Sequence, residues 1–502
     1  MAATICVLVF SAIVQPVTAA RTRPFKHGVA ARAEATRAML WTRASGAGRY
    51  RWQVARDALF TQIVDRGRAR AEQGHDFTLK PIARGLNPST RYFYRFLDGS
   101  ISSAVGRFKT LPRAGSPVAL NLAFTGDSDV LWTDHPDADA RPFEVLRRIA
   151  EENPDLFLYF GDTMYSDSET GAAPALTKRA KWAKYKANRL AATKRVLRTV
   201  STWAGWDDHE VINDFDGAVL EVDDPALLAA GVAAFNDYWP VAENRYYRKV
   251  DVGSEIDLIF LDERSYRTQS PDETDSPCRD DEGELDLAPT MPTSTRGQIG
   301  LPPVDPDCLA HVLDPTRTML GAEQLAWLKQ TLAESDATWK LIVNQVPMTQ
   351  IFVLPYDRWD GYAAERTDLL TYIRDSSIDN VVFLTTDIHA NVGSRVYVDI
   401  TEDNDNPVAY EVVAGPIQTC TLDCEVDKIR GEGQGQTLKT FLITRGLIDA
   451  DCVQINQYGY ATVEIPRSGA TLRAEWRSNE RARDGGGKRV VDCAPVTLPA
   501  AE

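Results

Sequence analysis

The sequence has no excess of basic residues, and after its first 20 residues it has no long apolar run. Its 502 residues contain 71 Asp and Glu but only 56 Lys and Arg, which gives a formal net charge of −15. A chain of this charge is not expected to bind nucleic acid or an anionic membrane non-specifically. No later stretch is long and apolar enough to span a bilayer. We therefore expect no nucleic-acid-binding module and no stable membrane anchor, and we expect a monomer.

The one markedly apolar segment is residues 1–20, which ends in small residues. This pattern predicts a secretory signal peptide that is cleaved near Ala20, and the alternative is an ordinary buried strand. With a signal peptide, the mature protein would be secreted, periplasmic or part of the cell envelope.

Cysteine is scarce, with seven residues in the whole chain. Removal of Cys6 with the signal leaves six, and an even number in an exported chain predicts up to three disulfides. The pairing is open, but local pairing favours Cys278–Cys308, which would close an acidic, Pro-rich insertion at 268–310. The alternative is buried free thiols. The remaining cysteines are Cys420, Cys424, Cys452 and Cys493.

The length suits two to three domains. Segments of residues 21–113 are rich in aromatic and β-branched residues and are separated by Gly and Pro, which predicts a small all-β sandwich of the fibronectin or immunoglobulin type. A linker follows at 111–117, and residues 114–502 then alternate between apolar strands and helical patterns, as an α/β domain requires. A long Lys/Arg-rich stretch predicts one helix over about 176–199, which forms a solvated face or, alternatively, steers anionic substrates.

Five loops after apolar stretches carry residues that can bind metal ions. Carboxylate and amide oxygens suit hard cations, whereas phenolate and imidazole suit iron or zinc. A single Asp after a strand is commonly a helix cap or a turn former, but five such loops in sequence order are hard to explain in that way. The candidate ligands are Asp127, Asp162, Tyr165, Asp208, Gln345, Asp387 and His389.

Several stretches resemble the alkaline phosphatase D (PhoD-like) family of calcineurin-like metallophosphoesterases, and their order and spacing cover almost the whole chain. They are Gly161-Asp162-Thr163-Met164-Tyr165, Trp206-Asp207-Asp208-His209-Glu210-Val211, Leu261-Asp262-Glu263-Arg264-Ser265-Tyr266-Arg267, Trp359-Asp360-Gly361-Tyr362 with Glu365-Arg366, and Thr386-Asp387-Ile388-His389. The resemblance implies a four-layer α/β/β/α sandwich as the catalytic domain at 114–502. It also implies Fe³⁺ with a tyrosinate ligand beside one or two Ca²⁺ ions, and Mg²⁺ or Mn²⁺ is possible at the second site.

Transferred to this sequence, the resemblance makes Asp162 a bridge between two metals. Tyr165 and His389 would bind the iron, Asp208 and Asp387 would bind the second metal, and His209 would face the substrate. The family usually has Cys at the first loop, whereas this chain has Asp127, which resembles the first ligand of purple acid phosphatases. Gln345 either binds a metal through its side-chain amide or donates a hydrogen bond to the residues that do.

The predicted activity is hydrolysis of phosphate monoesters or diesters by a metal-bound hydroxide, with His209 assisting the leaving group. Either Asp207 or Glu210 would keep His209 protonated. Arg264 could clamp a phosphate, and its alternative role is a buried ion pair with Asp262. Two other functions are a phospholipase D-type phosphodiesterase and a non-catalytic phosphate- or glycan-binding protein.

Overall fold

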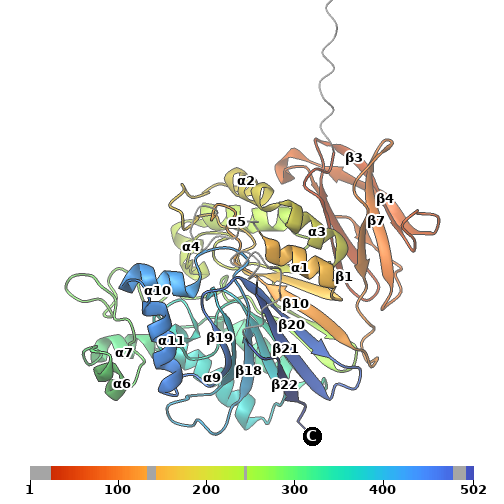
Figure 1. The fold of residues 1–502 in the computed structure, drawn as a ribbon. Coiled ribbons are helices and arrows are strands. Elements are labelled where there is room, and N and C mark those ends of the chain that lie inside the picture. Colours follow the sequence, from red (N-terminus) through yellow and green to blue (C-terminus); the bar gives the residue numbers. More distant parts are fainter. Residues whose placement is uncertain (1–23, 133–142, 242–245, 479–492, 502) are drawn as a thin grey trace, which may run out of the picture.

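The computed structural model describes residues 24–132, 143–241, 246–478 and 493–501; the predicted signal peptide lies outside these ranges. Figure 1 shows a small all-β unit packed against a larger α/β unit. None of the helices in the described ranges is long and apolar enough to cross a membrane.

Two sheets enclose the core of the N-terminal unit, so the predicted β-sandwich is present. Its aromatic residues, such as Trp52 and Tyr94, point inward and are buried. One sheet contains β1 (Val29–Ala33), β2 (Ala38–Arg43), β5 (Thr78–Leu79) and β6 (Ile82–Ala83). The other contains β3 (Gly48–Ala55), β4 (Ile63–Ala71), β7 (Arg91–Asp98), β8 (Ile101–Ser102) and β9 (Gly106–Lys109).

The larger unit contains two mixed sheets that face each other. The first has the order β12 (Ser201–Gly205), β11 (Leu156–Phe160), β10 (Leu120–Thr125), β20 (Gly459–Ile465), β21 (Thr471–Ser478), β22 (Val496–Pro499). The second has the order β13 (Arg248–Val252), β14 (Ile256–Phe260), β15 (Trp339–Asn344), β16 (Val381–Thr385), β18 (Ala409–Val413), β17 (Asn391–Val396), β19 (Ala450–Gln454). Apolar side chains of both sheets form one core, in which Trp203 and Phe260 stack with ring centroids 5.6 Å apart.

Helices cover the outer face of each sheet, which completes the predicted four layers. Because both faces of the central strands are covered, their sequences are apolar throughout, as in Leu156–Phe160. The first sheet is covered by α1 (Glu144–Glu152), α2 (Lys178–Asn188), α3 (Ala191–Thr199), α4 (Gly217–Asp223) and α5 (Pro225–Tyr238). The second is covered by α8 (Gly321–Ala333) and α9 (Ala363–Asp375). Trp359, from one of the stretches that resemble the PhoD-like family, is buried between the second sheet and these helices.

The single helix predicted over about 176–199 is wrong, because the chain breaks between α2 and α3. Asn188 turns inward, and its side-chain amide donates to the carbonyls of Ser128 and Thr163 at 2.9 and 3.0 Å. Arg189 has a non-helical backbone, and its guanidinium lies over the rings of Trp41 and Trp239. These buried contacts override the helical preference of the segment.

The insertion at 268–310 forms a lobe with two short helices, α6 (Thr293–Gln298) and α7 (Pro306–Val312). A disulfide joins Cys278 to Cys308, as local pairing predicted, and two further disulfides join Cys420 to Cys424 and Cys452 to Cys493. Near this lobe lie α10 (Leu422–Arg430) and α11 (Gln434–Thr444), drawn in blue in Figure 1.

Candidate metal centre

The candidate ligands follow strands that run in the same direction. Strands β10, β11 and β12 are parallel neighbours in the first sheet, and β14, β15 and β16 are parallel neighbours in the second. The loops after β10, β11, β12 and β16 therefore leave the carboxyl ends of their strands, where open α/β sheets bind ligands. Two sheets contribute to one site, which explains why its residues are so far apart in the sequence.

The backbone is strained at the candidate ligands. Asp127, Asp162, Asp387 and His389 all have positive φ angles, of 58°, 43°, 71° and 51°. Residues other than glycine rarely adopt this region, and the cost is of order 1–3 kcal/mol for each. The surrounding hydrogen bonds hold these loops in a conformation that brings the side chains together.

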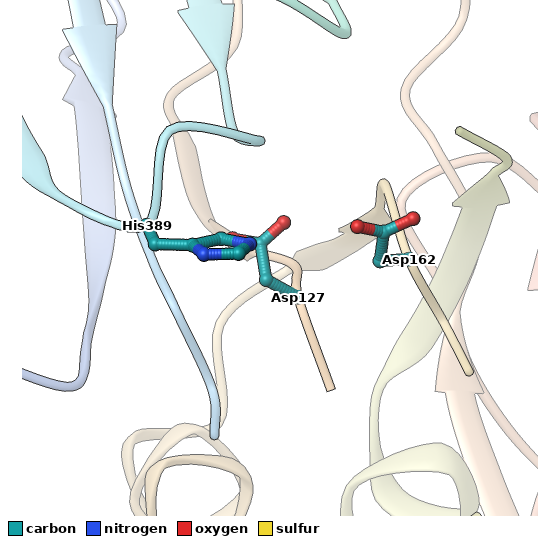
Figure 2. A group of neighbouring side chains, drawn as sticks. All are labelled: Asp127, Asp162 and His389. Carbon is teal, nitrogen blue, oxygen red and sulfur yellow. The ribbon is translucent and has the colours of Figure 1, made fainter. Parts of the chain in front are cut away.

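Asp127, Asp162 and His389 form the first group. One ligand atom of each lies within 4.8 Å of the others, and all three side chains are buried. Figure 2 shows them meeting from separate loops, with Asp127 between His389 and Asp162 in this view. The Tyr165 hydroxyl is 2.9 Å from Nε2 of His389. The group thus brings a phenol, an imidazole and two carboxylates together.

Asp162 also belongs to a second group with Asp208 and His209, and its backbone-facing oxygen accepts the His209 N–H at 3.1 Å. A neighbouring group joins Asp207 and Asp208 to Asp387. Because Asp162 lies in both the first and the second group, it is placed to bridge two cations. Asp207, which sequence reasoning assigned only to His209, adds a carboxylate to this second position.

The buried carboxylates have the properties of an ion-binding site. One oxygen each of Asp127, Asp162 and Asp207 is buried without a hydrogen-bond partner among the described residues. Burial and the neighbouring carboxylates raise the pKa of Asp127 and of Asp207 to about 7, and burial and Asp208 raise that of Asp162 well above its usual range. Cations would supply the missing partners and relieve this repulsion. The donor set therefore fits hard metal ions.

His209 is buried, and its ring stacks on Tyr165 with centroids 3.9 Å apart. Its Nδ1 is 2.8 Å from Asp167. Burial alone would lower the pKa of His209, but Asp208 and Asp167 raise it to about 9. Neither carboxylate expected from the sequence contacts the ring: Glu210 instead accepts the backbone N–H groups of Thr163 and Asp207. The correct partner, Asp167, lies two residues after Tyr165, and this proximity was the available signal.

The predicted ion pair between Arg264 and Asp262 is wrong. The Arg264 guanidinium is 0% exposed and forks onto Asp357, with nitrogen–oxygen distances of 2.7 and 2.9 Å. It also pairs with Asp207 and lies 3.4 Å from Asp387. Asp262 instead accepts the backbone N–H of Ser265 and the indole N–H of Trp206. These contacts direct the Arg264 charge at carboxylates, where it balances the acidic cluster.

The side-chain amide of Gln345 forms hydrogen bonds with the protein backbone. Its oxygen accepts the N–H of Glu263 at 3.2 Å, and its nitrogen donates to the carbonyls of Trp206 and Leu261. The amide therefore fastens the loop after β12 to those after β14 and β15. These contacts favour a supporting role for Gln345 over a role as a metal ligand.

Lys181 is a further residue that sequence reasoning missed. The basic composition of its segment predicts a solvated face, but Lys181 is 0% exposed. Its ammonium donates to the Ser166 hydroxyl at 2.7 Å and to the Val211 carbonyl at 2.6 Å. It thereby ties the loop of Tyr165 to the loop of Asp208 and His209. Nothing in the local sequence distinguishes Lys181 from its exposed neighbours.

This fold and this donor cluster define a metallophosphoesterase. The family model described as PhoD-like phosphatase matches residues 133–474, and that of the PhoD-like phosphatase N-terminal domain matches residues 12–112. The chain belongs to the PhoD-like phosphatase family, which confirms the resemblance drawn from the sequence.

Comparisons with individual proteins support this assignment. Alkaline phosphatase D of Bacillus subtilis (strain 168) is 26% identical over 401 residues, which are 73% of this chain and 62% of that protein. The match thus spans less than two thirds of the relative. A solved structure of PhoD has a TM-score of 0.74 at 23% identity and covers 96% of this chain and 91% of its own. The purple acid phosphatase PPD1 from yellow lupin (Lupinus luteus) seeds has a TM-score of 0.53 at 13% identity, with 95% and 74% covered. Both structures show the same fold.

Proposed function

We propose that this protein is a secreted, metal-dependent phosphoric-ester hydrolase, an alkaline phosphatase or phosphodiesterase. One observation carries the proposal: Asp162 is shared between two groups of buried ligands, and unpartnered carboxylate oxygens lie in both groups. Such a pair of sites suits phosphoryl transfer, which needs positioning and charge neutralisation more than covalent chemistry. The similarity to B. subtilis alkaline phosphatase D supports the same activity.

The residues would hold the metals as follows. Asp127, Tyr165 and His389 would bind Fe³⁺, and Asp208 and Asp387 would bind Ca²⁺, with Mg²⁺ or Mn²⁺ as alternatives. Asp162 would bridge the two ions. When bound, such ions supply a nucleophilic oxygen at neutral pH and neutralise charge on the phosphoryl group.

The protein's own groups complete the site. Because Nδ1 of His209 is engaged by Asp167, Nε2 is the nitrogen left to donate a proton to the departing oxygen. Stacking on Tyr165 fixes the plane of the ring. Arg264 would hold Asp207 and Asp357 in place through its ion pairs rather than clamp the phosphate.

The three disulfides support the export part of the proposal, because such bonds persist in oxidising compartments. The substrate would be a phosphate monoester or diester.

A paired assay tests the activity. Metal-loaded protein is offered p-nitrophenyl phosphate and bis-p-nitrophenyl phosphate, and the ratio of the two kcat/KM values separates monoesterase from diesterase. Asp162→Asn should lower kcat/KM by on the order of 10³-fold, because it removes the bridging charge. Asp251→Asn, at an exposed position of β13, is the matched control and should leave the rate unchanged. Absence of turnover of either ester by the metal-loaded protein would favour a non-catalytic binding protein.

A further inference from the structure

A residue of α10 contacts His389 at the ring nitrogen opposite the one that lies near Tyr165. Its Nδ1 is 2.6 Å from Oε1 of Glu425, which lies in the first half of α10. Glu169 approaches the same nitrogen more distantly, at 3.9 Å. A carboxylate on the far nitrogen of a histidine fixes its tautomer and ring orientation and increases the basicity of the nitrogen that faces the metal.

The first turn of α10 is attached to the His389 loop by its backbone as well. The Leu422 N–H donates to the carbonyl of His389 at 3.1 Å, and the Asp423 N–H donates to the carbonyl of Ile455 at 2.8 Å. Thr421 caps the helix by accepting the N–H of Cys424. The position of Glu425 therefore depends on the integrity of this one turn.

The second half of α10 is attached to α11 rather than to the His389 loop, because Asp427 accepts the N–H groups of Gly433 and Gly435 at 2.8 and 2.9 Å. The helix has nine residues, Val426 is its buried side chain, and its last three residues are exposed. A helix of this length is marginal on its own, and its ends fray. The Cys420–Cys424 disulfide spans the cap and the first turn, with the two Cα atoms 5.5 Å apart.

This disulfide differs from the other two in the loop it closes. Cys420 and Cys424 are separated by 4 positions, compared with 30 for Cys278–Cys308 and 41 for Cys452–Cys493. The entropy that a crosslink removes from the unfolded chain grows with loop length, so the shortest loop gives the smallest global stabilisation. Its effect is local, and the local structure it constrains is the turn that carries Glu425.

We propose that Glu425 is the positioning residue for the ligand His389, and that the Cys420–Cys424 disulfide acts through it by holding the first turn of α10. The inference rests on the metal centre of the proposed function. It assigns to this small crosslink a role in metal affinity rather than in global stability.

Metal affinity tests the first half. Wild-type protein and variants are stripped with a chelator and titrated with Fe³⁺ and, separately, with Mn²⁺, and occupancy is measured by mass spectrometry. Glu425→Ala should weaken binding by about 10–100-fold, as loss of such an outer partner does, and Glu425→Gln should recover part of it because the amide oxygen still accepts from Nδ1. The exposed Glu432, changed to Ala, is the control. Wild-type affinity in Glu425→Ala would overturn the proposal.

Paired disulfide variants test the second half. Cys420→Ala with Cys424→Ala should weaken metal binding about as much as Glu425→Ala while the thermal midpoint of the metal-free protein changes little. Cys278→Ala with Cys308→Ala should lower that midpoint and leave metal affinity unchanged. Equal effects of both pairs on metal affinity would contradict the assignment.

A double-mutant cycle separates action through Glu425 from general loosening. In the Glu425→Ala background, loss of Cys420–Cys424 should produce no further decrease in affinity, because the group it positions is already absent. Additive losses would overturn the proposed route. These titrations do not depend on turnover, so a wild type that binds metal but hydrolyses no ester would refute the proposed function and leave this inference standing.

Discussion

The hydroxyl of Tyr165 lies 2.9 Å from Nε2 of His389, although 224 positions separate the two residues in the sequence. Tyr165 follows β11 of the first sheet, and His389 follows β16 of the second. The contact therefore joins loops of the two sheets at the edge where the candidate ligands lie. One cation placed here could bind both side chains.

The first prediction concerns this cation. Burial and Asp162 raise the pKa of Tyr165 well above its usual range, so only a strongly charged metal would hold it as tyrosinate. Iron-loaded protein should show a visible charge-transfer band, and Tyr165→Phe should remove it. Tyr159→Phe is the matched control, because the Tyr159 hydroxyl contacts Ser128, which is not a candidate ligand. A colourless, iron-free wild type with full activity would contradict the iron assignment.

The second prediction concerns the other metal. Asp162, Asp208 and Asp387 offer carboxylate oxygens, which favour Ca²⁺, Mg²⁺ or Mn²⁺ over Zn²⁺. A calcium-selective chelator should abolish most phosphatase activity, and added Ca²⁺ should restore it. Asp387→Asn should raise the Ca²⁺ concentration needed for half-activity by tenfold or more. Restoration by zinc alone would show that the ligand assignment is wrong.

The third prediction concerns the proton donor. An alkyl leaving group needs a proton, whereas p-nitrophenolate hardly does. His209→Ala should therefore slow alkyl phosphate hydrolysis by about 10²–10⁴-fold and p-nitrophenyl phosphate hydrolysis much less. Asp167→Asn should show the same selectivity to a smaller degree, because Asp167 holds Nδ1 at 2.8 Å.

Metal content must be measured in both His209 and Asp167 variants. Equal slowing of the two substrates with unchanged metal would mean that His209 stabilises charge in the transition state. Loss of metal would make His209 a ligand, in keeping with its place near Asp162 and Asp208.

The fourth prediction concerns Lys181. Lys181→Met removes the donor to Ser166 and Val211 and leaves buried acceptors, which should cost about 1–3 kcal/mol. Burial lowers the pKa of Lys181 to about 8, below the value of about 10.4 in an unfolded chain. Between these values the unfolded state binds more protons, so the stability of wild type relative to Lys181→Met should rise with pH by up to about 1.4 kcal/mol per unit.

Urea unfolding at pH 8 and at pH 9.5 measures the Lys181 effect. Lys26→Met, at an exposed position, is the matched control. A stability difference that falls with rising pH would contradict the argument.

The fifth prediction concerns oxidation. Non-reducing peptide mapping of protein from its natural source should recover the pairs Cys278–Cys308, Cys420–Cys424 and Cys452–Cys493. The bonds that close the loops of 30 and 41 positions should each stabilise the fold by about 2–4 kcal/mol. Six free thiols would argue against both the disulfides and export.

Patterns with a short period were readable from the sequence. The run Leu156–Phe160 predicted a buried strand and is β11, because a strand covered on both faces must be apolar throughout. The loops bearing Asp162, Asp208 and His389 were likewise predictable, since polar residues just after such strands sit at one edge of the sheet. The four-layer fold followed from the family resemblance and is confirmed.

Partners across large sequence distances were not readable. Arg264 pairs with Asp357 and Asp207 instead of Asp262, and Lys181 is buried instead of solvated. The helix is interrupted at Arg189, although the composition of the segment favours a helix, because two tryptophan rings cover the Arg189 guanidinium. Local pattern contains no information about which distant side chain supplies the other half of a contact.

The sequence by itself determined the strands, the order of the ligand-bearing loops and the chemical type of their donors, because these depend on periodicity and residue type. The tertiary structure decided which candidate donors lie together and which residues hold them. Asp167 reached His209 because β11 and β12 are parallel neighbours in the first sheet. Glu425 reached His389 from a helix 36 positions later because the first turn of α10 packs on the His389 loop. Such proximity follows from the closure of the whole fold rather than from any local stretch of the chain.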